Sequence, residues 1–209
     1  MTDALKLGIL VSGNGTNLQA IIDAIENKEL DAKISIVLSS KKSAFALDRA
    51  KRHGLTAVCV DPSLFKNKAE YEREIIRHLR GSGAQWVVLA GYMKIITSEL
   101  LSAYQDHILN IHPSLLPAFT GLQAQAQALQ YGVKITGCTV HLVEEGLDSG
   151  PVIAQAAVPV LDSDTVESLN QRILEKEHQI YPRVLKWISE GRLKIEGRKV
   201  TVINPGVNI

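Results

Sequence analysis

Apolar residues in the first half of the chain form short continuous runs, separated by stretches in which apolar residues recur at helical spacing. Polar residues bound each run, which is typical of strands buried on both faces of a sheet. The runs are Leu7–Val11, Ile34–Leu38, Ala57–Val60 and Trp86–Ala90. Helices are predicted between them over residues 18–25, 44–53 and 71–79. This alternation predicts an α/β fold with a mostly parallel, Rossmann-like sheet and helices on both faces.

The second half of the chain departs from this alternation. Strands are predicted at Ile108–His112, 139–143 and 152–160, with a helix over 123–131. A long last helix should be capped by Ser163 or Asp164 and kinked or split at Pro182. The segments 193–195 and 200–203 flank a polar turn, so we expect a terminal hairpin and an antiparallel C-terminal portion. No repeat or linker interrupts the pattern, which predicts one domain over residues 1–209.

Composition narrows the function classes. The 209 residues are 45% hydrophobic and carry a formal charge of +1, which gives no electrostatic case for nucleic acid or an anionic membrane. Cys59 and Cys138 lie in β-type surroundings, so we expect reduced, buried thiols rather than a disulfide. No apolar run is long enough for a membrane span, and the N-terminus lacks the layout of a signal peptide. We therefore expect a cytoplasmic protein.

The glycine-rich stretch from Ser12 to Asn17 joins the first predicted strand to the first predicted helix. Successive backbone N–H groups at a helix N-terminus, with glycines that permit close approach, form an anion site. Candidate binding residues in it are Gly13, Asn14, Gly15, Thr16 and Asn17, with a further side-chain donor at Ser12. The stretch is neither a Walker A loop nor a full dinucleotide fingerprint, and a phosphate monoester is the better fit. A tight turn with a helix cap remains the alternative.

Asn110 and His112 stand two residues apart at the end of a predicted strand, and Pro113 ends the strand after them. Residues at this spacing point to the same face, so an amide donor and a titratable imidazole would share one space. Asp148 lies in a loop shaped by two glycines and a proline, and its carboxylate would suit pairing with His112. A hydrogen-bonded structural histidine and a solvated turn remain the alternatives.

Six motifs follow one another along the chain: Ser-Gly-Asn-Gly-Thr-Asn at 12–17, Ala-Gly-Tyr-Met at 90–93, Leu-Asn-Ile-His-Pro-Ser-Leu-Leu-Pro at 109–117, Gly-Cys-Thr-Val-His at 137–141, Asp-Ser-Gly-Pro-Val-Ile at 148–153 and Glu-His-Gln-Ile-Tyr-Pro at 177–182. In this order they resemble the phosphoribosylglycinamide formyltransferases, folate-dependent enzymes of purine synthesis, over nearly the whole chain. The resemblance implies a formyltransferase fold and transfer of the formyl group of 10-formyltetrahydrofolate to the amine of glycinamide ribonucleotide.

The resemblance also implies roles for particular residues. Asn110, His112 and Asp148 match the catalytic trio, with His141 in support. An N-terminal half, about 1–100, would hold the ribonucleotide phosphate at 13–17, and a C-terminal half, about 101–209, would bind folate and carry out catalysis. Glu177 matches a carboxylate that binds the ribose. Folate-contacting positions are Lys68, Met93, Lys94, Ile95, Ile96, Asn110, Val143 and Asp148. We expect no metal and no nucleotide cofactor, and a monomer or weak homodimer.

The chain departs from the family pattern beside the site. Thr120, Gln123 and Ala126 stand where the family usually has proline, histidine and arginine, and Lys68 and Lys94 replace common arginines. Lysine keeps the charge but loses the bidentate fork of arginine. These changes fall in positions that affect rate and loop order and leave the trio intact, so we expect an active enzyme.

Three alternatives stay open at this point. A methionyl-tRNA formyltransferase would carry an additional C-terminal domain, and a formyltetrahydrofolate hydrolase would carry an additional N-terminal domain. A catalytically silent ribonucleotide-binding module is favoured only by the altered 120–126 loop. Neither additional domain fits a chain whose first predicted strand begins at Leu7 and which ends at Ile209.

Overall fold

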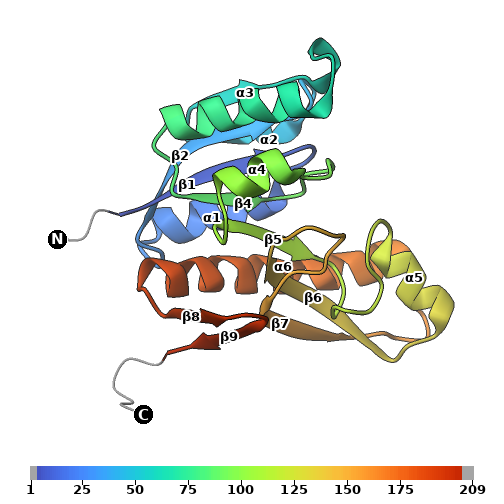
Figure 1. Cartoon of the computed structure of the whole chain (residues 1–209). Helices are drawn as coiled ribbons and strands as arrows, with labels where there is room; N and C mark the ends of the chain where they lie inside the picture. Colours follow the sequence, from blue (N-terminus) through green and yellow to red (C-terminus); the bar gives the residue numbers. More distant parts are fainter. Residues whose placement is uncertain (1–3, 204–209) are drawn as a thin grey trace. The chain divides into compact units, whose positions relative to one another are not determined.

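The computed structural model describes residues 4–203 of the chain (Figure 1). The chain forms two compact units, Met1–Asn110 and Ile111–Ile209. Hydrogen bonding orders the strands of the main sheet β3-β2-β1-β4-β5-β6-β7, and the boundary between the units falls within β5 (Ile108–His112). The predicted α/β class with a mostly parallel sheet is confirmed.

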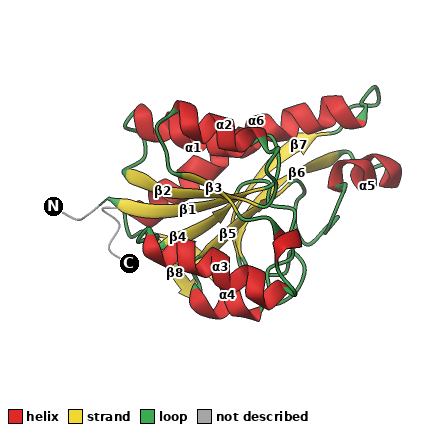
Figure 2. Ribbon diagram, turned by 90° about the horizontal axis from the view of Figure 1, so that it is seen from above, coloured by secondary structure: helices red, strands yellow, loops and turns green. Residues whose placement is uncertain are grey.

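The first unit is a parallel sheet with helices on both faces. Its strands are β1 (Leu5–Val11), β2 (Ala32–Ser39), β3 (Ala57–Cys59) and β4 (Trp86–Leu89), with β5 paired parallel to β4. Helices α1 (Thr16–Glu26) and α2 (Phe45–Arg52) cover one face, and α3 (Lys68–Gly81) and α4 (Ser98–Ala103) cover the other (Figure 2). A 3-10 turn, η1 (Pro62–Leu64), precedes α3. Both faces of the strands are thus buried, as their continuous apolar runs predict.

The second unit is built around an antiparallel pair. Strand β6 (Ile135–Leu142) pairs antiparallel with β7 (Val152–Pro159), and α6 (Val166–Ser189) packs against both strands. The short α5 (Ala124–Tyr131) packs against α6. The terminal strands β8 (Leu193–Glu196) and β9 (Lys199–Val202) form the predicted antiparallel hairpin.

The long helix differs from its prediction at two points. Its N-cap is Thr165 rather than Ser163 or Asp164, because the Thr165 hydroxyl accepts the Ser168 N–H in a capping box. Asp164 instead accepts the Leu161 N–H and pairs with Arg172. The helix is also not split at Pro182, so of the two effects predicted there, a kink or a split, only the kink stays a prediction. The fully buried residues around Pro182 hold both parts of the helix against the sheet.

Three smaller predictions also need correction. Helix α4 was not predicted from the sequence, and β6 begins four residues before its predicted start at Thr139. Both cysteines are free, but Cys59 is half-buried, so the prediction of two buried thiols holds only for Cys138. Burial raises the pKa of the Cys138 thiol to about 12, which keeps it protonated and unreactive. In the described range, no helix has the length and apolar character that crossing a bilayer requires.

Candidate active site

A buried imidazole and a nearly buried carboxylate meet in the second unit. His112, at the end of β5, has 6% of its side chain exposed, and Asp148, in the loop after β6, has 10%. The distance from His112 Nδ1 to Asp148 Oδ2 is 3.3 Å. Polar groups this deeply buried carry a desolvation cost unless they pair, so the two side chains act as one unit. The structure therefore brings together two of the three residues predicted to be catalytic.

The backbone of residues 119–121 contacts both members of this pair. His112 Nε2 lies 2.8 Å from the Phe119 carbonyl oxygen, and the Gly121 N–H donates to Asp148 Oδ2 over 2.8 Å. The two ring nitrogens of His112 thus face two oxygen atoms, one of the Asp148 carboxylate and one of the Phe119 backbone. The altered loop is ordered in this structure, because Gln127 Nε2 donates to the carbonyl oxygens of Thr120 and Leu122.

The loop that carries Asp148 has a tightly constrained backbone. Asp148 itself has φ 49°, a left-handed conformation that aspartate tolerates better than most residues. Gly150 lies against the backbone, since a Cβ there would overlap the Leu142 carbonyl oxygen. Arg198, in the turn of the terminal hairpin, donates to the Ser149 carbonyl oxygen over 2.9 Å. These contacts hold the carboxylate in one position beside His112.

A second histidine lies on the far side of the same carboxylate. His141 Nε2 is 3.9 Å from Asp148 Oδ1, and its Nδ1 is 2.8 Å from the Leu142 carbonyl oxygen. Its side chain is 2% exposed, and burial holds the pKa of His141 below its usual value. A neutral His141 lets Asp148 direct its charge toward His112, in keeping with the predicted supporting role.

Asn110 belongs to the first unit and lies two residues before His112 on β5. The alternation of side chains along a strand directs Asn110 and His112 to the same side of β5. Asn110 is half-buried, whereas its neighbours Leu109 and Ile111 are buried. The amide and the imidazole therefore lie on the same side of β5, as their spacing in the sequence predicts.

The loop between β1 and α1 has the shape of an anion site. Gly15 is the N-cap of α1 with φ 72°, and no side chain caps the helix there. A Cβ at Gly15 would lie 2.6 Å from Ala46 Cβ, so glycine is required by both conformation and space. Arg49 on α2 donates to the Asn14 carbonyl oxygen over 2.9 Å, a contact that sequence reasoning missed. The N-terminus of α1 therefore lies at a loop of fixed shape, as expected of an anion site.

One predicted donor in this loop is otherwise engaged. Ser12 is 4% exposed, and its hydroxyl lies 2.7 Å from the Ser40 hydroxyl and accepts the Met93 N–H over 2.9 Å. Ser12 therefore ties the glycine loop to the segment after β4 and is not available to a phosphate. Of the other loop residues, Gly13 and Asn14 are exposed, Thr16 is half-buried, and Gly15 and Asn17 are buried.

Four of the predicted folate-contacting residues line one cavity of about 460 Å³ in the first unit: Lys68, Met93, Lys94 and Ile95. Met93 and Ile95 are 64% and 71% exposed, although large apolar side chains are more often buried. Tyr71 and Glu72 of α3 also line the cavity, and the sequence pattern had indicated only a core-facing helix there. The backbone N–H and carbonyl groups of 94–96 form no hydrogen bond within residues 4–203, so they are open to a ligand.

The remaining predicted residues are not among those that line this cavity. Ile96 is half-buried but is not in the cavity wall, and Val143 and Asp148 belong to the second unit. Glu177 is a 5% exposed carboxylate on α6, near enough to Cys138 to help raise the pKa of that thiol.

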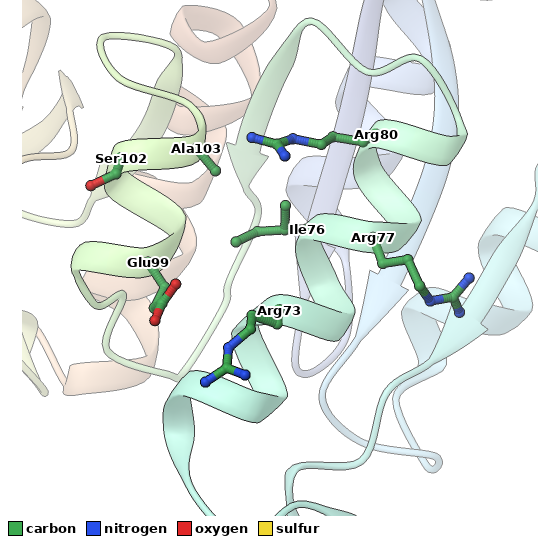
Figure 3. A pocket seen from close by; sticks show the side chains of 7 residues that line it. All are labelled: Arg73, Ile76, Arg77, Arg80, Glu99, Ser102 and Ala103. Carbon is green, nitrogen blue, oxygen red and sulfur yellow. The ribbon is translucent and has the colours of Figure 1, made fainter.

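A larger groove, of about 600 Å³, lies between α3 and α4 and contains none of the predicted residues. Arg73 and Arg80 reach from α3 toward α4, whereas the guanidinium of Arg77 points away and pairs with Glu74 (Figure 3). Glu99 adds a negative charge on the opposite wall. Because these cations do not converge, the groove does not provide a formed anion site. Across residues 4–203, no three histidine, cysteine, aspartate or glutamate side chains cluster closely enough to hold a metal ion.

Comparison with known proteins finds similar sequences and structures. The sequence profile described as formyl transferase matches residues 5–185. A phosphoribosylglycinamide formyltransferase of Bacillus subtilis is 42% identical over 181 residues, covering 87% of this chain and 93% of the relative. The crystal structure of glycinamide ribonucleotide transformylase 1 from Symbiobacterium toebii superposes with a TM-score of 0.96 at 46% identity, covering 98% of this chain and 96% of the other.

A more distant relative has a different activity in its name. The structure of a formyltetrahydrofolate deformylase from Pseudomonas syringae superposes with a TM-score of 0.91 at 29% identity. The match covers 97% of this chain but 67% of that one. The same fold thus occurs in a protein named for a different reaction, so the site must decide between the two.

Proposed function

The chain belongs to the formyl transferase family, and we propose that it transfers the formyl group of 10-formyltetrahydrofolate to the amine of glycinamide ribonucleotide, a step of purine synthesis. The observation that carries the proposal is the buried pair of His112 and Asp148 at the end of β5. The products are formylglycinamide ribonucleotide and tetrahydrofolate. The high identity to relatives named for this reaction supports the same assignment.

The chemistry begins with attack of the amine nitrogen on the formyl carbon. A new C–N bond forms, and the carbonyl oxygen becomes the oxyanion of a tetrahedral intermediate. The bond between the formyl carbon and N10 of the folate then breaks. The proton that leaves the amine ends on N10, so atoms and charge balance without any further reactant.

Each member of the trio has one task in this scheme. Asn110 donates a hydrogen bond to the oxyanion. His112, as imidazolium, stabilises the same charge and helps to protonate the departing N10. Asp148 keeps His112 charged and oriented through the contact at 3.3 Å, and a water carries protons between amine and leaving group.

Each of the two units contributes residues that we assign to substrate binding. In the first unit the backbone of Gly13–Asn17 holds the ribonucleotide phosphate, and segment 93–96 with Lys68 receives the folate. In the second unit Glu177 binds the ribose, and Val143 and Asp148 complete the folate contacts. The open backbone groups of 94–96 and the exposed side chains of Met93 and Ile95 support the folate assignment.

Segment 119–121 must move during the reaction cycle. His112 Nε2 is bonded to the Phe119 carbonyl oxygen in this structure, so that nitrogen cannot reach a ligand until the contact opens. Thr120 lies within the segment, and Gln123 and Ala126 follow it at the start of α5. Their departure from the family pattern therefore bears on the rate of opening rather than on the chemistry of the trio.

Hydrolysis of formyltetrahydrofolate is the second candidate, favoured by the fold shared with the deformylase. One assay separates the two functions: the absorbance change of tetrahydrofolate formation, followed with and without glycinamide ribonucleotide. Formyl transfer predicts product only when the ribonucleotide is present. Release of formate at the same rate without it would overturn the proposal and favour the hydrolase.

Three narrower predictions accompany the proposed reaction. We expect one domain, a monomer or weak homodimer, and a cytoplasmic protein that acts on small molecules rather than nucleic acid. Sedimentation velocity across a hundredfold range of concentration tests the oligomeric state. A stable higher oligomer at the lowest concentration would contradict it.

A further inference from the structure

Segment 91–97, which joins β4 to α4, is anchored at both ends by buried polar groups. At its start, the Ser12 N–H donates to the Gly91 carbonyl oxygen over 3.1 Å, and the Ser12 hydroxyl accepts the Met93 N–H. The hydroxyls of Tyr92 and Tyr71 lie 2.7 Å apart. The first part of the segment is therefore fixed to Ser12, which directly follows β1, and to α3.

At its other end the segment is anchored by one carboxylate. Glu72 on α3 is 3% exposed, and its Oε1 accepts the Thr97 N–H over 2.8 Å. Its Oε2 accepts the Thr97 hydroxyl over 2.6 Å and the Leu100 N–H over 3.1 Å. A single side chain thus receives three hydrogen bonds from the junction between the segment and α4.

The Glu72 side chain caps the N-terminus of α4 in place of the N-cap residue. Thr97 is the N-cap of α4 by position, but its own side chain makes no capping bond. The Thr97 hydroxyl donates to Glu72, and the Leu100 N–H, which an N-cap side chain would normally accept, is taken by Glu72 as well. The start of α4 is therefore fixed from a different helix, α3.

The part of the segment between the two anchors faces outward. Met93 and Ile95 present apolar surface, and with Lys68, Lys94 and Glu72 they line the same cavity. A binding surface on a backbone fixed at both ends loses little conformational entropy when a ligand binds. If one anchor is lost, the segment becomes less ordered, and the ligand must order it on binding. The entropy cost of that ordering weakens binding.

We propose that Glu72 is a positioning residue that holds segment 93–96 in its folate-binding conformation. This inference rests on the proposed function, because that function assigns the segment to the folate. Glu72 does not touch the reacting atoms, so its loss should weaken the binding of folate and leave the ribonucleotide and the chemical step largely unaffected.

The test compares Glu72→Gln with the wild-type protein. Glutamine keeps the shape, but one carboxylate oxygen becomes an amide donor, so it meets an N–H or O–H donor whichever way the amide is turned. We expect the KM for 10-formyltetrahydrofolate to rise about tenfold, equivalent to about 1.4 kcal/mol. The KM for glycinamide ribonucleotide and the kcat should change less than about twofold, well below that tenfold step.

Thr97 supplies a second pair of variants that disturbs the fold less. Thr97→Val removes the hydroxyl bond to Glu72 with little change of shape and should raise the same KM by a few-fold. Thr97→Ser keeps the hydroxyl and should match the wild type. Because the two residues share one network, the double variant Glu72→Gln with Thr97→Val should show less than the product of the two single effects. Glu74→Gln, on the same helix, is the matched control for the loss of a carboxylate outside the network.

The outcomes separate the inference from the proposed function. Formyl transfer by the wild type with an unchanged folate KM in Glu72→Gln and Thr97→Val overturns the positioning role alone, as does an equal rise in both KM values. If the wild type transfers no formyl group, calorimetric titration of tetrahydrofolate into the wild type and Glu72→Gln decides. About tenfold weaker binding by the variant sustains the inference, whereas equal binding, or none to either protein, overturns it.

Discussion

Segments 91–97 and 119–121 both carry groups that we assign to substrate contact, yet they are held in opposite ways. Segment 91–97 is fixed by Ser12 and Glu72, whose bonds lie away from its exposed side chains. Segment 119–121 is held by the catalytic pair itself, since Phe119 and Gly121 bond to His112 and Asp148. On our assignment the folate-binding surface is thus formed before a ligand arrives, whereas His112 has to be uncovered before it can act. Preorganisation serves affinity, and a covered imidazole restricts the chemistry to the open state.

The largest effect should come from the catalytic pair. We expect His112→Ala or Asp148→Ala to lower kcat about a thousandfold, because proton transfer and charge stabilisation are lost together. Circular dichroism should show that both variants fold. Asp162→Ala, which removes a 92% exposed carboxylate from the same unit, should leave kcat unchanged. Near-wild-type turnover in both site variants would mean that His112 and Asp148 have a structural role only. The contacts of segment 119–121 with them would then not control catalysis.

The next effect concerns the glycine loop between β1 and α1, which the structure also holds in a fixed shape. Gly15→Ala forces a side chain into the left-handed region and against Ala46, at a cost of about 2 kcal/mol or more. The loop should relieve this strain by shifting, so the KM for the ribonucleotide should rise at least tenfold while the folate KM changes little. Steady-state kinetics with each substrate varied and a thermal melt measure both effects.

Gly13 supplies the control for the Gly15 experiment. A Cβ at Gly13 has no atom within 4 Å, and its φ is not in the left-handed region, so Gly13→Ala should melt with the wild type. If Gly15→Ala also melts with the wild type and binds the ribonucleotide equally well, the loop is not rigid. The glycine loop would then not be a second preformed region beside segment 91–97.

The sequence predicts the fold better than it predicts these contacts, for physical reasons. Buried parallel strands leave continuous apolar runs, so β1 to β4 could be located from residue types alone. The six-residue α4 could not, because its capping acceptor is Glu72 on another helix. Four consecutive residues, 162–165, are all common N-caps, and local sequence could not single out Thr165.

In the candidate site, too, residue types reveal some features and only the fold reveals others. His112, Asp148 and Asn110 could be proposed from the sequence because the proposed chemistry uses their side chains. The contacts from Phe119 and Gly121 use backbone atoms, which residue identity does not reveal. Ser12 was expected to face a ligand, but a hydroxyl serves a buried network equally well, and only the fold shows that Ser40 and Met93 claim it.

A smaller effect tests how the covering segment is held. Gln127→Leu removes the two bonds from its side chain to the carbonyl oxygens of Thr120 and Leu122. Weaker support favours the open state, so we expect kcat/KM to rise about threefold, as exposed hydrogen bonds are worth about 1 kcal/mol or less. Gln130→Leu on the same helix is the matched control. A fall in kcat for Gln127→Leu would show instead that the covered arrangement is the active one.

The smallest effect should be a pH dependence of stability that comes from His141. Burial lowers the pKa of His141 in the folded protein below its value of 6.5 in the unfolded chain, the neighbouring His112 lowers it further, and the Leu142 carbonyl and Asp148 raise it in part. The folded state thus binds the proton less readily than the unfolded state does. This contribution to stability is complete above pH 6.5 and is lost as the pH falls below that value.

Thermal melts between pH 7.5 and 5 on the wild type and His141→Asn should isolate this term. Asparagine can keep the hydrogen bond to the Leu142 carbonyl oxygen but cannot titrate. Whatever its stability at pH 7.5, the variant should lose less than the wild type on acidification, with a difference on the order of a few degrees. His107 is exposed and its Nδ1 likewise faces a carbonyl oxygen, that of Gln105, so His107→Asn should follow the wild-type curve. If the melting temperatures of the wild type and His141→Asn fall equally with pH, burial does not keep His141 neutral. The pairing of Asp148 with His112 rather than with His141 would then need another cause.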